Sequence, residues 1–319
     1  MNCFKSNGKF MLTGEYLVLK GAVALALPLK LGQSMNVETL DSDEDKIYWN
    51  AFLKTTNQRV NETTSWFNVV LRKSDLCVIK ADDKEKAERL SDILSKVKSL
   101  NNNIFKENHD YRFSTLLDFD SQWGLGSSST LINNVAEWAN IDPYQLLGLT
   151  FKGSGYDIAC AKANGPIFYE TTSGDNYKQV QRSETASFYP DFKDNLYFVY
   201  LGHKQNSSKE VKAFLDKDKD YTEEIKSVSE ISRMLPSIND LDEFCRLMDT
   251  HEDIIASCIG RHCVRDDFKG FEGMVKSLGA WGGDFILAAT KHDEDYVKKY
   301  FENKSLDVII KYKDIVLDN

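Results

Sequence analysis

The chain has 319 residues, enough for one large domain or two ordinary ones, and 42 % of them are hydrophobic, which suffices for a core. With 28 % charged residues and only five prolines, the composition argues against disordered, collagen-like and coiled-coil proteins. The 49 acidic and 40 basic residues leave a formal net charge of −9, which argues against nucleic acid or an anionic membrane as a partner held by bulk charge.

Targeting and metal signals are also weak. Residues 1–9 lack the apolar core of a signal peptide, and no apolar run approaches the roughly 20 residues of a membrane-spanning helix. The six cysteines include no Cys-x-x-Cys pair, and the group Cys258, His262 and Cys263 matches no zinc spacing. We therefore expect a cytoplasmic protein whose cysteines are mostly small buried hydrophobes.

The first hundred residues predict a mixed sheet followed by a helix. Short stretches rich in β-branched and aromatic residues predict strands at residues 9–13, 22–27, 33–39, 46–52 and 66–71. Residues 84–100 predict a helix, because apolar residues recur there at 3.6-residue spacing and three asparagines follow.

The remaining segments mix strands and helices. Residues 111–119 predict a strand that runs into a glycine loop, and a mostly buried helix follows around residues 131–139. Strands are expected at 166–171, 195–201, 274–278, 285–289 and 307–312, with helices from 207 to about 260 and a charged helix before the last strand. This order indicates an α+β protein of two lobes, with domains at residues 1–190 and 191–319.

The glycine loop is the most informative stretch. Residues 123–130 read Trp-Gly-Leu-Gly-Ser-Ser-Ser-Thr between a predicted strand and a predicted helix. Glycines let the backbone approach a ligand, and the N–H groups and dipole of a helix start attract an anion, so the loop outlines a phosphate site. It is neither a Walker A loop nor a dinucleotide fingerprint. A glycine turn with a serine N-cap would also explain it.

Two further segments complete a pattern. Residues 6–16 read Ser-Asn-Gly-Lys-Phe-Met-Leu-Thr-Gly-Glu-Tyr, and residues 276–284 read Lys-Ser-Leu-Gly-Ala-Trp-Gly-Gly-Asp. Together with residues 124–128 they resemble the three signature motifs of the GHMP small-molecule kinases, in the same order. Within that superfamily the chain is most similar to the phosphomevalonate kinase branch, and mevalonate kinases are the sibling branch. Three features carry this similarity: the Leu-Thr-Gly-Glu-Tyr of the first motif, residues 153–159, and the Gly-Gly-Asp that ends the third motif.

The resemblance implies a fold and a set of ATP-binding residues. It implies a mixed-sheet N-terminal lobe, a ferredoxin-like C-terminal lobe and an active site between them. The ATP phosphates would be held by six residues, namely Gly124, Leu125, Gly126, Ser127, Ser128 and Ser129, with Ser128 near Mg²⁺. Asp157 would be the active-site aspartate and Lys9 the lysine that faces it and the acceptor.

The resemblance also implies contacts with the acceptor. These would come from Ser207, Ser208 and Lys209, with Lys204 adjacent. The turn Gly279–Gly283 of the third motif would close over the phosphates, with Gly282 and Gly283 as substrate-binding residues. Glu15 is either a structural hydrogen-bond acceptor or a catalytic group. The partners implied are ATP and a phosphorylated small molecule, without nucleic acid or membrane, and the oligomeric state stays open.

The chain departs from the family at two places. Trp281 replaces a small residue, usually glycine, in the third motif, and the proline often found before the second motif is missing. The tryptophan would either flank the site as an aromatic wall or alter ATP binding. The expected function is transfer of the ATP γ-phosphate to phosphomevalonate in isoprenoid precursor synthesis. The alternatives are a mevalonate kinase, the related ATP-dependent decarboxylase and a kinase-fold binding protein without turnover. The Gly-Gly-Asp ending of the third motif disfavours the decarboxylase.

Overall fold

The computed structural model describes residues 2–57, 60–151, 153–171, 181–202, 207–217, 219–279, 281 and 283–318. The chain forms two compact units that alternate along the sequence. The first consists of Met1–Gly8, Leu31–Ser121 and Leu125–Lys162, and the second of Lys9–Lys30, Gln122–Gly124 and Ala163–Asn319. The predicted domain boundary at residues 190/191 stays a prediction.

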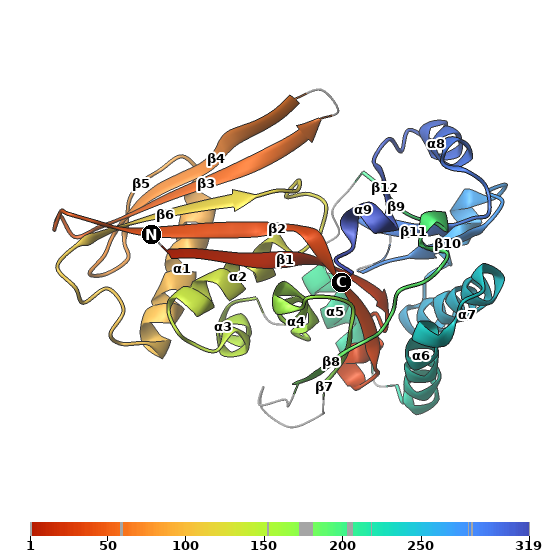
Figure 1. Cartoon of the computed structure of the whole chain (residues 1–319). Coiled ribbons are helices and arrows are strands. Elements are labelled where there is room, and N and C mark those ends of the chain that lie inside the picture. The colour runs from red at the N-terminus through yellow and green to blue at the C-terminus, as the bar shows by residue number, and fades with distance from the viewer. Residues whose placement is uncertain are drawn as a thin grey trace. The chain divides into compact units, whose positions relative to one another are not determined.

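The first unit is built on a mixed sheet (Figure 1). Its strands hydrogen-bond in the order β5, β4, β3, β6 and β2, and only the pairing of β3 with β6 is parallel. β1 also pairs with β2. The bounds are β1 Asn2–Thr13, β2 Ala24–Leu40, β3 Lys46–Asn57, β4 Val60–Arg72, β5 Val78–Ala81 and β6 Asp110–Leu117.

Four helices pack on this sheet through apolar faces. They are α1 Lys84–Leu100, α2 Ser127–Trp138, α3 Pro143–Thr150 and α4 Tyr156–Lys162. α1 begins where the Asp83 side chain accepts a hydrogen bond from the Lys86 amide, which caps the helix. Its buried face joins a core that contains the stacked rings of Trp49 and Phe113, whose centroids lie 4.8 Å apart. This core holds α1 and α2 against the strands.

The second unit contains the rest of the large sheet and a small antiparallel sheet. β7, Ile167–Thr171, pairs with residues 24–26 of β2, and β8, Gln181–Thr185, pairs with β7. The small sheet has the order β10, β11, β9, β12. Its strands are β9 Leu196–Tyr200, β10 Met274–Ser277, β11 Phe285–Ala289 and β12 Ile309–Lys311. The helices of this unit are α5 Ser207–Leu215, α6 Thr222–Met234, α7 Leu241–Ile259, α8 Glu294–Glu302 and α9 Tyr312–Ile315.

Two apolar clusters stabilise the second unit. One packs α8 against the small sheet, with Val297 and Phe301 contacting β9 and β11. The other joins α5, α6 and α7 to Tyr16 and Trp281. Every helix in the described part of the chain is too short or too polar to cross a lipid bilayer.

The observed elements agree with most of the predicted ones and differ at β2. The predicted α+β class is confirmed, and α1 has the predicted bounds. The strands predicted at 22–27 and 33–39 are one strand, because Gly32 does not make a turn: a Cβ there would lie 3.0 Å from the Ser6 carbonyl carbon, so the glycine permits close approach of β1. The sequence pattern also failed to predict β5 and α3.

Candidate functional site

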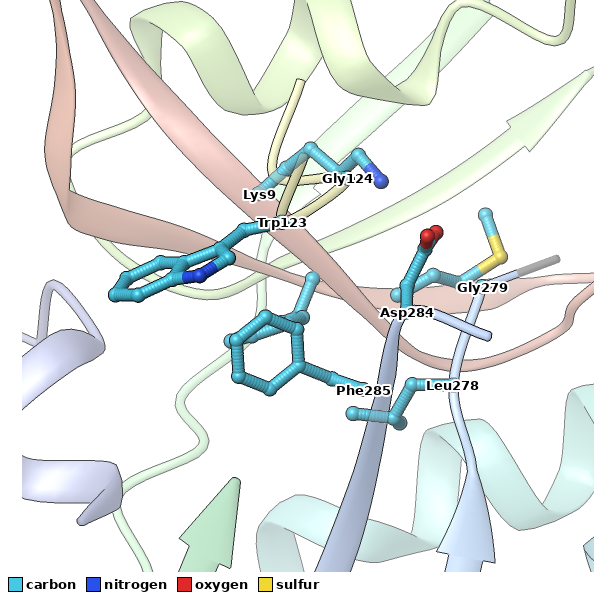
Figure 2. A pocket seen from close by; sticks show the side chains of 9 residues that line it. Lys9, Trp123, Gly124, Leu278, Gly279, Asp284 and Phe285 are labelled. Carbon is cyan, nitrogen blue, oxygen red and sulfur yellow. The ribbon is translucent and has the colours of Figure 1, made fainter. Parts of the chain in front are cut away.

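Three segments that are far apart in the sequence line one pocket of the second unit (Figure 2). They are residues 9–11 of β1, residues 123–124, and the β10–β11 connection with Leu278, Gly279, Asp284 and Phe285. Each segment belongs to a different one of the three motifs. The pocket is shallow: its cavity volume is about 10 Å³, about the room of one water molecule and far less than the roughly 300–1,000 Å³ of a complete small-molecule site. These residues therefore outline only part of a ligand site.

Lys9 is held at the pocket by its neighbour. Phe10 is 4 % exposed and stacks on Phe198 of β9, with centroids 4.3 Å apart, and it meets Phe285 edge-on at 5.2 Å. This packing fixes the position of β1 at residues 9–11, all three of which line the pocket. Figure 2 shows the half-buried Lys9 side chain and the Asp284 carboxylate extending toward the same part of the pocket.

Gly124 lies directly against Asp284. Its φ of +69° belongs to the left-handed region, and a Cβ at this position would lie 2.5 Å from Asp284 Cγ. Any larger residue would push the carboxylate away. Beside it, the Trp123 ring meets Phe285 edge-on with a centroid distance of 5.9 Å and forms an aromatic wall.

Trp281 points away from this pocket into the core. Its side chain is 2 % exposed and packs with Tyr16, Phe214 and Ile255, and its carbonyl accepts a 2.8 Å hydrogen bond from Arg261. Its φ of +56° is the left-handed conformation that glycine adopts easily. The backbone of Trp281 thus takes a conformation that a glycine would adopt without strain. The aromatic wall expected from the sequence therefore does not describe the position of Trp281, whereas the other expectation, altered ATP binding, stays a prediction.

In the first unit, α2 begins without a side-chain cap. Gly126 is the N-cap residue, with φ +96°, and it forms no side-chain cap hydrogen bond. The Ser129 hydroxyl donates instead to the Gly126 carbonyl at 2.9 Å, and Ser128 is exposed. A serine N-cap does not form. The first N–H groups of a helix have no partner within the helix and can donate to an anion.

Buried polar side chains anchor α2 behind this loop. The Ser6 hydroxyl donates to Asn134 Oδ1 at 2.7 Å, and Asn134 Nδ2 donates to the Gln33 carbonyl at 3.0 Å. The Thr130 hydroxyl is 3.0 Å from Gln33 Oε1. These bonds tie α2 to β1 and β2, so the loop between β6 and α2 has a fixed end.

The remaining predicted residues are placed as follows. Asp157 lies in the first turn of α4, half-buried, and accepts a 3.1 Å bond from the Ile158 amide. Burial and, less, the Asp157 charge raise the pKa of Tyr144 to about 12. Leu125 and Gly283 are buried, and Ser127 is half-buried. Ser207, Ser208 and Lys209 begin α5, of which only the backbone is described there, and Lys204 and Gly282 lie outside the described residues.

Sequence reasoning gave no role to Asp284, Trp123 or Phe285, although all three line the pocket. For these three residues the sequence held one local sign of a site: the carboxylate of Asp284 directly follows two glycines in the third motif. The aromatic residues gave no such signal, because aromatic side chains are common in cores.

No protein-family model and no curated protein sequence match the chain, but solved structures do. The mevalonate kinase of Methanococcus jannaschii is similar with a TM-score of 0.67 and 17 % identity, covering 100 % of this chain and 98 % of that one. The phosphomevalonate kinase of Streptococcus pneumoniae, solved with phosphomevalonate and AMPPNP, has a TM-score of 0.66 and 13 % identity over 98 % and 100 % of the two chains. The chain has the GHMP kinase fold. The L. major mevalonate kinase solved with R-mevalonate is also similar, with a TM-score of 0.63 and 14 % identity over 98 % of this chain and 95 % of that one.

The motifs predicted a two-lobed α+β fold with a mixed-sheet lobe and a ferredoxin-like lobe, and the structure has a large mixed sheet and a small antiparallel sheet, in agreement with the GHMP kinase fold. At identities below 20 % the likeness concerns the fold. A fold alone does not determine activity or acceptor, which depend on the residues of the site.

Proposed function

We propose that the chain is an ATP-dependent kinase of isoprenoid precursor synthesis that transfers the γ-phosphate of ATP to phosphomevalonate. The observation that carries the proposal is the pocket in which Lys9, Gly124 and Gly279 meet, one residue from each motif. The shared fold with mevalonate and phosphomevalonate kinases supports the same class of reaction.

The chemistry asks for alignment and charge neutralisation. In phosphoryl transfer the protein mainly positions donor and acceptor and offsets negative charge. The uncapped start of α2 offers N–H groups for ATP phosphates, and Lys9 offers a cation to the acceptor phosphate. A phosphate monoester has a second pKa of about 6, so it is already largely a dianion at neutral pH. It needs no general base, and Asp157 then has an orienting role.

The residues present fit a magnesium ion brought in with ATP. Mg²⁺ prefers hard oxygen ligands and is commonly bound by a few protein oxygens together with phosphate oxygens and water. Ser128 is exposed and supplies a hydroxyl oxygen in the first turn of α2. The ion would supply positive charge next to the transferred phosphoryl group.

A parallel assay tests the acceptor. ADP release is measured with mevalonate, phosphomevalonate and diphosphomevalonate under identical conditions, and turnover is expected only with phosphomevalonate. Turnover only with mevalonate would make the chain a mevalonate kinase. Tight ATP binding by calorimetry without ADP formation from any acceptor would make it a binding protein. The feature that first suggested a binding protein, Trp281, lies in the core.

The roles of the two charged residues are tested by kinetics. Lys9→Met removes the cation that holds the acceptor and is expected to lower kcat/KM by about 10³-fold, while Asp157→Asn costs clearly less because no base is required. A loss above about 10⁴-fold for Asp157→Asn together with an almost unaffected Lys9→Met would contradict this assignment.

A further inference from the structure

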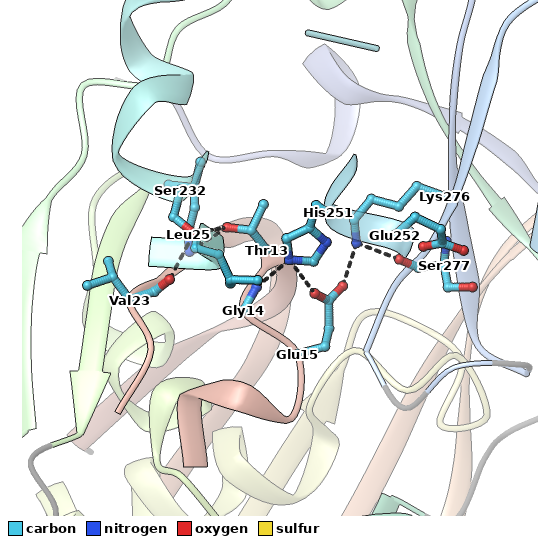
Figure 3. A network of polar contacts seen from close by, with 11 residues as sticks. Thr13, Gly14, Glu15, Val23, Leu25, Ser232, His251, Glu252, Lys276 and Ser277 are labelled. Atoms are coloured by element: carbon cyan, nitrogen blue, oxygen red, sulfur yellow. Dashed lines mark hydrogen bonds and ion pairs between the residues drawn. The ribbon is translucent and has the colours of Figure 1, made fainter. Parts of the chain in front are cut away.

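Four ionisable side chains are buried together near the pocket but do not line it (Figure 3). Glu15, His251, Glu252 and Lys276 are each at most 1 % exposed, and all lie in the second unit. Glu15 follows β1, His251 and Glu252 are on α7, and Lys276 is on β10. Burying charge is costly unless each group is paired, so this cluster calls for a reason.

The contacts of the cluster fix two chain segments. Lys276 Nζ donates to Glu15 Oε1 at 2.7 Å and to the Ser277 carbonyl at 2.8 Å. Glu252 accepts bonds from the amides of Ser277 and Val264, each at 3.1 Å. The end of β10 is therefore held by a side chain of α7 and linked to the turn after β1.

The other end of the cluster holds the turn itself. The Gly14 amide donates to His251 Nε2 at 2.9 Å, so this nitrogen carries no proton and the ring is neutral. Burial and the nearby Lys276 charge keep the pKa of His251 well below its usual value, which agrees with that assignment. His251 Nε2 also lies 3.4 Å from Glu15 Oε2.

Both held segments continue directly into the pocket walls. Glu15 comes four residues after Met11, and Lys276 comes two residues before Leu278. A hydrophobic pair of similar size is often as stable as a buried ion pair, so stability alone does not require these charges. What the ion pair adds is a single defined geometry between the two segments.

We infer that Glu15 and Lys276 are positioning residues for phosphoryl transfer: their ion pair sets the Leu278–Gly279 wall relative to the Lys9–Met11 wall of the pocket. The inference rests on the proposed kinase function. Neither residue touches the pocket, so both act through the segments that they hold. A displacement of about 1 Å at such a distance from the chemistry can cost about 10²-fold in rate.

The ionisation of the pair gives the inference a pH signature. Burial raises the pKa of Glu15 to about 7, against the opposite effect of Lys276. The charged groups that face Glu15 are Lys276 on β10 and Glu252 on α7, with neutral His251 beside it. The ion pair is therefore complete only above about pH 7, and kcat/KM is expected to rise through that pH.

The test compares an ion-pair variant with an apolar pair. Lys276→Met is expected to lower kcat/KM on the order of 10²-fold and to lower the unfolding midpoint. Combining it with Glu15→Leu is expected to restore the unfolding midpoint but not kcat/KM. Glu15→Gln is expected to abolish the rise of kcat/KM through pH 7. A double variant that regains full kcat/KM, or a Glu15→Gln variant that keeps the rise, would overturn the inference.

A second buried lysine provides the matched control. Lys73 is 6 % exposed and donates to the carbonyls of Glu107 and His109 in the first unit, away from the pocket residues in sequence. Lys73→Met is expected to lower stability with no change in kcat/KM. An equal loss of kcat/KM in Lys73→Met and Lys276→Met would reduce the role of Lys276 to general stability and overturn the inference.

A structural readout separates this inference from the proposed function. The Leu278 amide donates to the Phe285 carbonyl at 3.2 Å, and its hydrogen exchange reports on the pocket wall without any turnover. Lys276→Met is expected to speed this exchange at least tenfold, whereas Lys73→Met leaves it unchanged. If the wild-type protein turns over none of the three acceptors, the proposed function fails, and unchanged exchange at Leu278 separately overturns the positioning role.

Discussion

Trp281 departs from the third motif of the kinases that the sequence resembles, and its side chain does not line the pocket. Its backbone takes a left-handed conformation, φ +56°, and its ring fills a cluster with Tyr16 from the first motif. A side chain at this position thus links two motif segments through the core. The same conformation is costly for a non-glycine residue, by about 1–2 kcal/mol, and the buried ring offsets that cost.

Trp281→Gly should therefore destabilise the protein although it restores the residue usual in the family. Removing a large buried ring lowers the free energy of unfolding by about 3–5 kcal/mol. The relief of backbone strain offsets about 1–2 kcal/mol of this loss. Urea unfolding measures the difference. Trp281→Phe is the control and should lose less than half as much, because it keeps most of the packing and removes an indole N–H without a partner in the described residues. An unchanged stability with a tenfold change in ATP affinity would place the ring in the pocket instead.

Gly124 gives a second prediction at this scale. Gly124→Ala forces the Asp284 carboxylate to move and is expected to lower kcat/KM by about 10²-fold. Gly270→Ala is the control, since Gly270 has φ +91° and no atom near its Cβ position. Both variants should lose about 1–2 kcal/mol of stability from left-handed strain. Equal kcat/KM in the two variants would show that the Gly124–Asp284 approach has no bearing on turnover.

Among the elements, α2 depends on polar anchors as well as on its apolar face. Asn134 is fully buried and is bonded to Ser6 of β1 and Gln33 of β2. Asn134→Ala removes one hydrogen-bond partner from the buried Ser6 hydroxyl and one from the buried Gln33 carbonyl. We expect each loss to lower the free energy of unfolding by about 1–3 kcal/mol. Asn50→Ala, at a half-buried asparagine bonded to Asn68, should cost less than about 1 kcal/mol. Thermal unfolding of the two variants tests the difference, and equal midpoints would contradict it.

Local patterns predicted the elements better than the contacts between them. The bounds of α1 follow from five apolar residues at helical spacing and from Asp83 at its start, all within one stretch of chain. The partner of Glu15 lies 261 residues away on β10, and no periodicity or spacing encodes such a pair. Gly32 misled the strand prediction for the same reason, since its role is set by Ser6 on another strand.

In the candidate site, too, local sequence patterns predicted single residues, but not the contacts between distant segments. Lys9, Gly124 and the Gly279 turn could be predicted from the three motifs, because glycine turns and charged residues leave a signal in the sequence. The Asp284 contact and the inward direction of Trp281 depend on how distant segments pack. Of the two roles expected for Glu15, that of a structural hydrogen-bond acceptor describes its observed contact with Lys276 better than a direct catalytic role.

For the whole molecule, the buried cluster predicts a composite dependence of stability on pH. Glu15 has a folded-state pKa of about 7 against the ordinary 4.5, so folding takes up a proton between these values and the free energy of unfolding falls as pH rises. His251 has a pKa well below 6.5, so unfolding takes up a proton below that pH and stability rises toward it. The two slopes oppose each other in the wild-type protein.

Glu15→Gln separates the two slopes. Relative to wild type, its free energy of unfolding should increase by about 3 kcal/mol from pH 4.5 to pH 7.5, since each unit of pKa shift is worth about 1.4 kcal/mol. Glu252, whose pKa burial also raises, is present in both proteins and cancels. Urea unfolding at several pH values measures this difference, and a difference independent of pH would refute the assignment.

The separation of Glu15 and Lys276 along the chain also bears on how the protein is made. At about 5–20 residues per second, the ribosome adds the 261 residues between them in roughly 13–50 s. The turn after β1 lacks its lysine throughout this time, and it also lacks His251 until α7 has been made. The second unit therefore cannot finish folding during synthesis of the N-terminal segments, and a nascent chain halted before residue 276 should expose this turn to proteases.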